Sequence, residues 1–319
     1  MTRNISVLGD SISTFEGCIP ADFAVFYTGE RLDSTGVKTP DDTWWMQVIN
    51  HMGGRFLANA SWSGSMVEGA GFPCGNSDAR VAALAGPHGE APDDVLVYYG
   101  TNDYGWGGPD AQIEGRASSV PFDLVREGKL GEPATAGLAP AGAVTRFGEA
   151  YAAMLGRVRA AYPQARIWCF TLAPGRVHNC RTSTFPRNFR GETFYAYNQA
   201  ICHAAAQQGA EACDISAWGF DYEGIEGTHP TNLGMRQLAW LMNRCVDQVE
   251  GAKLECEEPY PGGDIFRSND PCTQPDRACV GCPHAMSTGN QWMHVCLLGC
   301  PLEVDAKVAW PHPPIECEQ

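Results

Sequence analysis

Ile5-Ser6-Val7-Leu8-Gly9-Asp10-Ser11-Ile12-Ser13 is the stretch that decides the fold of this chain. Its apolar run is typical of a strand buried in a parallel sheet, and the Gly-Asp-Ser that follows is typical of a turn. In open parallel α/β sheets, ligands bind in the crevice outside the carboxyl ends of the strands. The stretch therefore predicts a buried first strand that places Ser11 where a nucleophile is useful.

The rest of the chain alternates between short apolar runs and segments with helical spacing. Further strands are predicted at 56–59, 95–99, 166–172 and 211–215, and helices at 43–52, 77–85, 146–162, 194–208 and 232–249. Residues 104–145 have weak periodicity and read as an insertion over a strand end. The alternation predicts an α/β protein in which a parallel sheet carries helices on both faces, joined by right-handed crossovers.

Composition narrows the class of protein and its partners. The 319 residues are 44% hydrophobic and 18% charged, which is enough apolar material for a folded core. The net charge of -15 argues against nucleic acid and anionic membranes as partners, because phosphate binding needs clustered Lys and Arg. No segment is long and apolar enough to span a bilayer, and no apolar leader precedes the first strand, so a cytoplasmic location is expected.

Polar residues gather where the predicted strands end. Ser11, Gly64 and Asn102 each follow a predicted strand, and Glu226-Gly-Thr-His229 precedes the last long helix. A serine hydrolase needs a base for the serine proton, a group that orients this base, and donors for the oxyanion. We expect Ser11 to be the nucleophile, His229 the base and Glu226 the orienting carboxylate, with Gly64 and Asn102 in the oxyanion hole.

Each of these features has a simpler reading when it is taken alone. Ser11 could be a helix N-cap, and Asn102-Asp103 could be a turn that ends a strand. The segment from Glu226 to His229 could be an exposed loop. His178, in an Arg-rich loop after the predicted strand at 166–172, is a rival candidate for the base. The four features occur together without a competing arrangement, which favours the catalytic interpretation.

These motifs resemble a known family. Gly9-Asp10-Ser11, the segment 59–64, Gly100-Thr101-Asn102-Asp103 and the segment 226–230 look like blocks I, II, III and V of the SGNH/GDSL hydrolase superfamily, in the same order. The resemblance implies a flavodoxin-like, three-layer α/β/α sandwich with a parallel sheet of about five strands. It also implies an oxyanion hole formed by the backbone N–H groups of Ser11 and Gly64 and by the Asn102 side chain, with His229 as the base.

One position departs from the family pattern. The family usually has Asp three residues before the histidine, whereas this chain has Glu226. The carboxylate is kept, but the extra methylene changes its reach. Asp221 is an alternative orienting group for His229, and a Ser-His dyad is a third possibility.

The substrate is less well defined by the sequence. Arg176 belongs to an Arg-rich loop after the fourth strand, and Trp106 begins the insertion next to Asn102, so both are candidate substrate contacts. Ordinary surface pairing and a surface loop are the simpler readings of these two residues. The absence of a broad apolar lid helix favours short acyl groups on polar small molecules, and an O-acetyl ester of a carbohydrate fits by family analogy.

The alternative function comes from another class of protein. A non-catalytic SGNH-like binding protein could dock a partner through a metal-bound tail. The change to Glu226 favours this alternative, whereas the retained Ser11, Gly64, Asn102 and His229 favour a serine esterase.

Half of the 14 cysteines lie between Cys256 and Cys317. Two close pairs in this region have the spacing of a tetrahedral zinc site, namely Cys279 with Cys282 and Cys296 with Cys300. We expect a catalytic domain at 1–252 and a Cys-rich tail at 253–319 that is held by structural zinc; catalysis itself needs no cofactor. Free thiols, a disulfide or an iron–sulfur site are the alternatives, and substitute zinc ligands are Cys272, His284 and His294.

Overall fold

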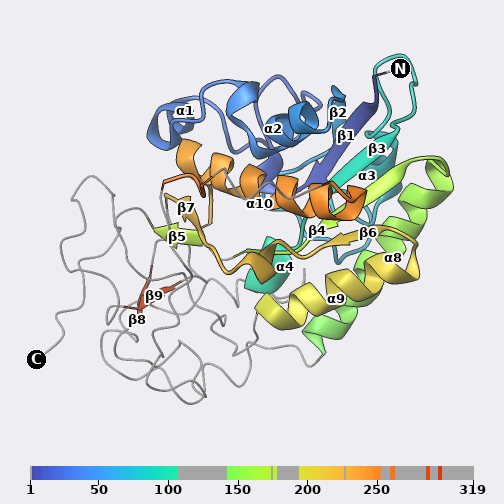
Figure 1. The fold of residues 1–319 in the computed structure, drawn as a ribbon. Helices are drawn as coiled ribbons and strands as arrows, with labels where there is room; N and C mark the ends of the chain where they lie inside the picture. The colour runs from blue at the N-terminus through green and yellow to red at the C-terminus, as the bar shows by residue number, and fades with distance from the viewer. Residues whose placement is uncertain are drawn as a thin grey trace, which may run out of the picture.

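A five-stranded parallel sheet forms the centre of the protein (Figure 1). The computed structural model describes residues 2–106, 142–173, 175–177, 194–225, 228–252, 259–262, 285–287 and 294–296. The strand order is β2-β1-β3-β4-β6, the order of flavodoxin-like folds. The bounds of these strands are β1 Asn4–Gly9, β2 Arg55–Asn59, β3 Asp94–Tyr98, β4 Arg166–Phe170 and β6 Glu211–Cys213. The predicted parallel sheet is confirmed.

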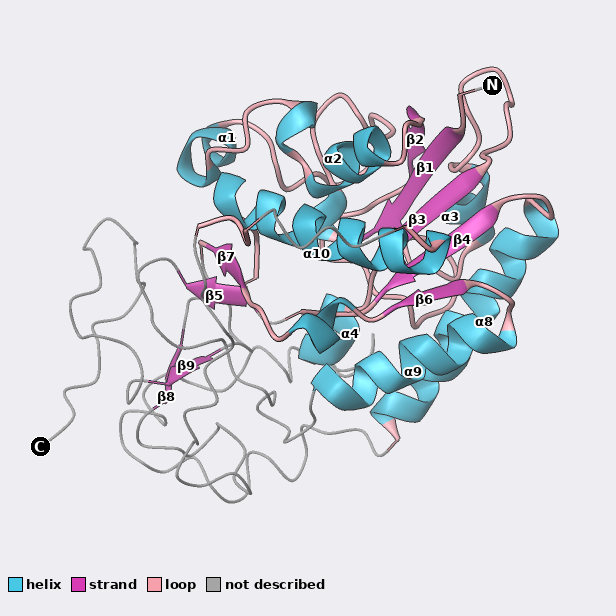
Figure 2. Cartoon of the chain, in the orientation of Figure 1, coloured by secondary structure: helices cyan, strands magenta, loops and turns pink. Residues whose placement is uncertain are grey.

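Helices cover both faces of this sheet (Figure 2). One face carries α2 (Trp44–His51) and α10 (Asn232–Glu250), and the other carries α3 (Asp78–Ala82), α8 (Ala143–Ala161) and α9 (Phe194–Gln207). Short helices and 3-10 turns lie in the connections: α1 Glu30–Thr35, α4 Thr101–Trp106, η1 Ser11–Ser13, η2 Pro40–Asp42 and η3 Ile215–Trp218. The described part of the chain is the three-layer α/β/α sandwich that the sequence predicts.

Helix α2 shows how the sequence builds one of these layers. Thr43 caps its N-terminus, because the threonine hydroxyl oxygen accepts a hydrogen bond from the Met46 N–H at 3.3 Å. Trp44 then packs edge-on against Tyr98 of β3 and Phe170 of β4, with ring centroids 5.7 and 6.1 Å apart. These buried aromatic contacts fix the helix across the middle of the sheet.

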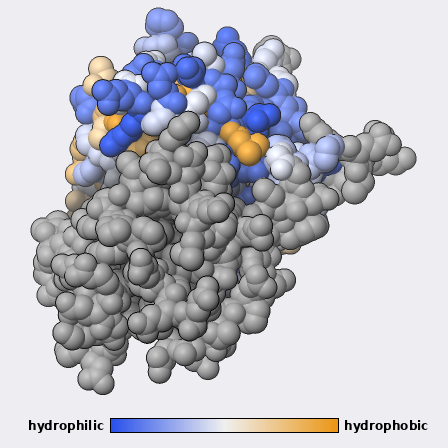
Figure 3. All heavy atoms as spheres, turned by 90° about the vertical axis from the view of Figure 1, so that its left-hand side faces the viewer, coloured by the Kyte–Doolittle hydropathy of each residue, from blue (hydrophilic) through white to orange (hydrophobic). Residues whose placement is uncertain are grey.

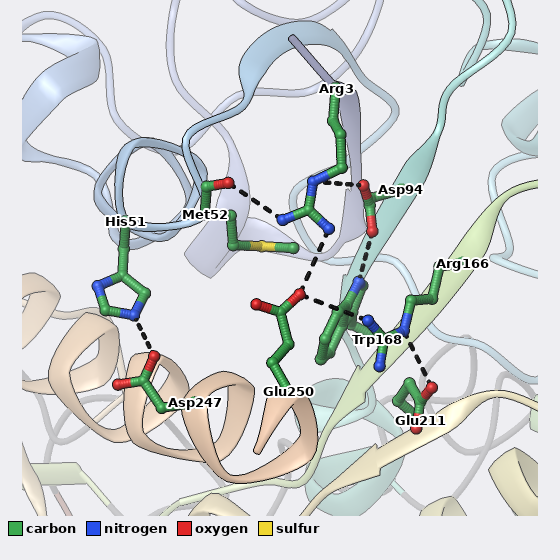
Figure 4. Close-up of polar contacts among 9 residues, drawn as sticks. All are labelled: Arg3, His51, Met52, Asp94, Arg166, Trp168, Glu211, Asp247 and Glu250. Atoms are coloured by element: carbon green, nitrogen blue, oxygen red, sulfur yellow. Dashed lines mark hydrogen bonds and ion pairs between the residues drawn. The ribbon is translucent and has the colours of Figure 1, made fainter. Parts of the chain in front are cut away.

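Charged residues close the amino end of the sheet (Figure 4). Glu250 at the end of α10 forms ion pairs at 3.4 Å with both Arg3 and Arg166, which precede or begin β1 and β4. Asp94 accepts a hydrogen bond from the Trp168 indole N–H at 2.8 Å. Ion pairs that are this exposed contribute little to the free energy of unfolding. They lie at the amino end of the sheet, whereas ligands of open parallel α/β sheets bind at the carboxyl end.

Two further strand pairs lie in segments for which the sequence predicts no strand. β5 (Gly175–Val177) pairs in parallel with β7 (Tyr222–Gly224), and β8 (Ala285–Ser287) pairs antiparallel with β9 (His294–Cys296). A three-residue strand is too short to show a period of two, so hydrophobic patterning cannot detect it. The alternative reading of Asn102-Asp103 as a turn that ends a strand is wrong, because Thr101–Trp106 forms the short helix α4.

The described cysteines outside the tail behave as small apolar residues. Cys18, Cys74, Cys169, Cys202, Cys213 and Cys245 are free thiols. Burial raises the pKa of the Cys169 and Cys213 thiols, so the reactive thiolate is disfavoured at both positions. In the part of the chain that the structure describes, no helix is long and apolar enough to cross a membrane.

Gly9 is a position where the fold tolerates no side chain. A Cβ atom there would lie 2.5 Å from Ser13 Oγ and 2.7 Å from the Tyr98 carbonyl oxygen. We expect Gly9→Ala to lower the free energy of unfolding by about 1–3 kcal/mol, as overpacking does, measured by urea denaturation.

Gly148→Ala is the matched control for this substitution. Gly148 lies within α8, and the nearest atom to its added Cβ is Ala200 Cβ at 3.4 Å. A glycine-to-alanine change within a helix should raise stability by about 0.5–1 kcal/mol. Equal stability of Gly9→Ala and the wild type would contradict the close packing described for β1.

Candidate active site

Ser11 lies at the first residue of η1, immediately beyond β1. The buried side chain of Asp10 caps this turn, because its Oδ1 accepts a hydrogen bond from the Ile12 N–H at 3.1 Å. The first N–H groups of a helical turn have no partner within the turn, so the Ser11 amide is one that can face a ligand. Ser11 as a whole residue is 6% exposed.

The structure brings His229 to Ser11 across 218 positions of sequence. The histidine Nε2 lies 2.9 Å from Ser11 Oγ, which is within hydrogen-bonding distance. In this geometry the imidazole can accept the serine proton when its Nε2 carries no hydrogen. Ser11 and His229, which the sequence predicted as nucleophile and base, therefore meet in the folded chain.

Backbone hydrogen bonds fix the loop that carries His229 between β7 and α10. The Ile225 N–H donates to the His229 carbonyl at 3.0 Å, and the Thr231 N–H donates to the Glu223 carbonyl at 3.1 Å. Thr231 also caps α10 by accepting from the Gly234 N–H at 3.2 Å. The histidine is thus held at the junction of a strand and a long packed helix, which limits its movement.

Asn102 and the turn containing Gly64 also lie together. The Asn102 side-chain amide donates to the Ser65 carbonyl at 2.9 Å, and Gly64 adopts a left-handed conformation with φ of 80°. A side-chain amide has two N–H groups. One of them fixes Asn102 against this turn, and the other remains to donate elsewhere.

Arg80 connects the strand ends beneath this site, and sequence analysis did not identify it. Its side chain is fully buried and donates to the Gly9 carbonyl at 2.7 Å and to the Ala60 carbonyl at 2.5 Å. It also donates to the Ser65 hydroxyl at 3.1 Å and to the Pro73 carbonyl at 2.6 Å. One arginine in a five-residue helix carries no sequence signal for such a role.

Two buried carboxyl groups flank the site residues. Burial raises the pKa of Asp10 to about 6, although the Ile12 N–H and the nearby His229 oppose the shift. Burial likewise raises the pKa of Asp103 to about 7, against the hydrogen bonds that its carboxylate accepts from the Val67 and Glu68 N–H groups, both at 2.9 Å. Asp103 thereby ties the start of α4 to the segment after Gly64.

Several predicted site residues fall partly or wholly outside the described part of the chain. Glu226 lies outside it, and so do the side chains of Trp106 in α4 and Arg176 in β5. Asp221, the alternative orienting group, is buried, and its backbone carbonyl accepts a hydrogen bond from the Tyr260 hydroxyl at 2.6 Å.

The predicted zinc ligands also lie outside the described part of the chain, wholly or in their side chains. Cys279, Cys282 and Cys300 are outside the described ranges, and only the backbone of Cys296, within β9, is described. Among the residues that are described, no group of three or more His, Cys, Asp or Glu side chains could hold a metal ion.

Comparison with known proteins supports the family resemblance. Residues 3–115 match the family model of the GDSL-like lipases/acylhydrolases, a range that contains the first three of the four sequence blocks. A candidate GDSL-like lipase from Bacteroides ovatus shares the fold at 19% identity and a TM-score of 0.50, covering 78% of this chain and 99% of that protein. No curated protein sequence matches the chain.

Two further structures are similar at lower scores. A candidate GDSL-like lipase from Bacteroides uniformis is 22% identical, with a TM-score of 0.49 and coverage of 78% of this chain and 96% of its own. A carbohydrate esterase family 2 enzyme with a carbohydrate-binding domain, from Corynascus thermopiles, is 17% identical. Its TM-score is 0.46, with coverage of 78% of this chain and 67% of its own.

The raised pKa of Asp10 predicts a pH-dependent stability. The group titrates at about 6 when folded and near 3.8 in its reference state, so the folded protein holds this proton more tightly. Its stabilising contribution is complete below about pH 4 and is lost as the pH rises through about 6. We expect the stability advantage of the wild type over Asp10→Asn to shrink between about pH 4 and 8, by on the order of 3 kcal/mol.

Urea denaturation of both proteins across this pH range measures the effect. Asp33→Asn is the matched control, because the Asp33 side chain is 82% exposed. A stability difference between the wild type and Asp10→Asn that is independent of pH would contradict the role of burial at Asp10.

Proposed function

We propose that this chain, whose residues 3–115 match the family model of the GDSL-like lipases/acylhydrolases, is a serine esterase for short acyl groups on polar small molecules. The observation that carries the proposal is the 2.9 Å contact between Ser11 Oγ and His229 Nε2 at the carboxyl end of the sheet. A serine and a histidine in this geometry form the minimum unit of nucleophilic acyl transfer.

The proposed reaction uses Ser11 twice. Ser11 Oγ attacks the ester carbonyl carbon while His229 Nε2 takes the serine proton. The bond to the alcohol then breaks, and His229 returns the proton to the leaving oxygen. A water molecule attacks the acyl-serine with His229 again as base, which releases the acid and restores the hydroxyl.

In this proposal the developing oxyanion is bound by the Ser11 and Gly64 backbone amides and by the Asn102 side chain. Support comes from the 2.9 Å bond between the Asn102 amide and the Ser65 carbonyl, which holds this side chain beside Gly64. Such preorganised donors act without reorganisation during the reaction, so each has a large effect on rate.

A carboxylate is proposed to orient His229, and Glu226 is the first candidate because it lies three residues before the histidine. Asp221 is the second candidate, since it is buried near the start of β7. Asp10 adds a third charge, because its carboxylate and His229 attract one another. An anionic neighbour stabilises the imidazolium that forms when the histidine accepts a proton.

The preference for polar substrates rests on the described surface. Only three large hydrophobic residues in the described ranges are exposed, namely Phe72, Tyr195 and Val249. The described residues on the face in Figure 3 are mainly hydrophilic, with hydrophobic ones in small patches. Long-chain lipid substrates favour a broad apolar surface, so short acyl groups fit this protein better.

An aromatic cluster beside Gly64 supports a carbohydrate as the alcohol portion. Phe23, Trp62 and Phe72 contact one another with ring centroids 4.7 to 5.4 Å apart, and Phe72 is 46% exposed. Trp62 belongs to the turn that leads to Gly64. The exposed ring of Phe72, which packs on Trp62 two residues before Gly64, suits the flat apolar face of a sugar ring, and a carbohydrate O-acetyl ester is therefore the proposed substrate.

The Cys-rich tail at 253–319 is proposed to be a separate, zinc-bound unit. The pairing of β8 with β9 aligns Cys296 with Ala285. In the sequence, Ala285 follows Cys282 by three residues. Zinc bound by four thiolates would stabilise a short segment that has little core of its own.

Substitution of the proposed catalytic residues tests the esterase. We expect Ser11→Ala and His229→Ala to lower kcat by about 10³-fold or more on acetylated sugars and aryl acetates. Asn102→Ala should lower kcat by about 10²–10³-fold, the usual effect of removing one oxyanion donor. A fluorophosphonate probe should label the wild type and leave Ser11→Ala unlabelled.

The exposed serine variant Ser34→Ala is the matched control and should retain wild-type turnover and labelling. Wild-type activity in Ser11→Ala would refute the assignment of the nucleophile. Faster hydrolysis of long-chain than of acetyl esters would refute the substrate class.

Metal analysis of the full chain tests the zinc proposal. We expect about one zinc per chain, reduced in the double variant Cys279→Ser/Cys282→Ser and retained in the control Cys18→Ser. Purified protein without stoichiometric zinc would rule out this site.

A further inference from the structure

The ring of Phe26 lies flat against the ring of His229. Their centroids are 3.5 Å apart and the two planes differ by 3°. Phe26 belongs to the loop between η1 and α1 and is 7% exposed, so its ring is held by its surroundings. The residue shares no sequence motif with the histidine, and only the fold brings the two rings together.

Hydrogen bonds link the position of Phe26 to that of Ser11. The Phe26 N–H donates to Thr14 Oγ1 at 2.9 Å, and the Thr14 hydroxyl donates to the Ser11 carbonyl at 2.9 Å. The Ser11 side chain lies 2.9 Å from His229, which stacks on Phe26. These four residues form a closed circuit, so the stacked ring has a fixed position relative to the serine.

The neighbouring residue, Tyr27, also ties this loop to the histidine segment. The Tyr27 hydroxyl donates to the carbonyl of Pro230 at 2.9 Å, one residue beyond His229. The loop from Phe26 to Tyr27 therefore contacts both the ring and the backbone of the histidine segment. A change at Phe26 that keeps Tyr27 removes the ring contact while the backbone contact is retained.

The geometry of the stack fits a charged imidazole better than a neutral one. Two neutral aromatic rings prefer offset or edge-to-face contacts, whereas a cation is attracted to the face of a phenyl ring. His229 becomes cationic when it takes the proton of Ser11. Two other charged groups act on these rings: the Arg31 guanidinium lies 4.3 Å from the centroid of the Phe26 ring, and the Asp10 carboxylate attracts the imidazolium electrostatically.

Arg31 and His229 occupy opposite faces of the Phe26 ring, because an imidazole at 3.5 Å leaves no room for a guanidinium on the same face. The phenyl ring is therefore held between two groups. Its π electrons separate two cations once His229 is protonated, which reduces the repulsion that direct contact would cause.

We propose that Phe26 is a positioning residue for His229, which fixes the plane of the imidazole and stabilises its protonated form during acyl transfer. The proposal rests on the proposed function, because it requires His229 to act as the base. It makes Phe26 important for kcat rather than for substrate binding, since the protonated form arises only along the reaction.

Kinetics of three variants test this role. We expect Phe26→Leu to lower kcat roughly tenfold while KM stays within about twofold, since it removes the ring and keeps an apolar side chain. Phe26→Tyr should restore most of kcat because it keeps the aromatic face. Phe56→Leu is the matched control, because the Phe56 ring packs on Trp45 with ring centroids 5.0 Å apart. Phe56 pairs with Ile5 at the amino end of the sheet, away from Ser11, so this substitution should leave kcat unchanged.

An NMR measurement tests the stack without relying on activity. The ring current of Phe26 should shift the His229 ring protons upfield, and His229→Ala identifies these signals by their absence. Phe26→Leu should move them downfield, whereas Phe56→Leu should not. Unchanged His229 signals in Phe26→Leu, or an unchanged kcat in that variant, would overturn the proposal.

The two proposals fail in different ways. If Ser11→Ala keeps wild-type turnover, the esterase assignment fails, whereas the NMR shift still reports the contact between Phe26 and His229. If the wild type is labelled at Ser11 and Phe26→Leu is as fast as the wild type, only the role of Phe26 fails.

Discussion

The buried guanidinium of Arg80 is the interaction on which the arrangement of the site depends. It donates hydrogen bonds to the carbonyls that end β1 and follow β2, and to the Ser65 hydroxyl beside the Gly64 turn. A cation fully removed from water is costly unless all its donors are satisfied, and here carbonyl and hydroxyl oxygens satisfy them. Because its planar donor groups point in fixed directions, Arg80 sets the separation of the segments that carry Ser11 and Gly64.

Asp103 and Asn59 extend this buried polar framework. Asp103 accepts from two backbone amides after the Gly64 turn, and the Asn59 side chain donates to the Ser13 carbonyl at 2.8 Å while accepting from the Ser61 N–H at 2.9 Å. Each of these groups joins segments that are far apart in the sequence. The carboxyl end of the sheet is thus held by directional hydrogen bonds, whereas exposed ion pairs line its amino end (Figure 4).

The main strands and helices followed from the sequence because their patterns are long. Apolar runs and helical spacing identified β1, β3, β4, α8 and α10 to within a few residues. Ser11, Asn102 and His229 could be proposed because they follow or precede these elements. The roles of Arg80 and Phe26 could not be predicted, since each depends on contacts between segments whose spacing only the folded chain defines.

The separation of 218 residues between Ser11 and His229 also has a consequence for how the protein is made. The serine, the Gly64 turn and Asn102 leave the ribosome well before the histidine does. The histidine is placed only when α10 docks, through the hydrogen bond of Asn232 with Asp42 at 2.9 Å and the burial of Met235 against α2. In the proposed esterase, the nascent chain therefore carries the nucleophile segment before its base, and docking of this last long helix completes the site.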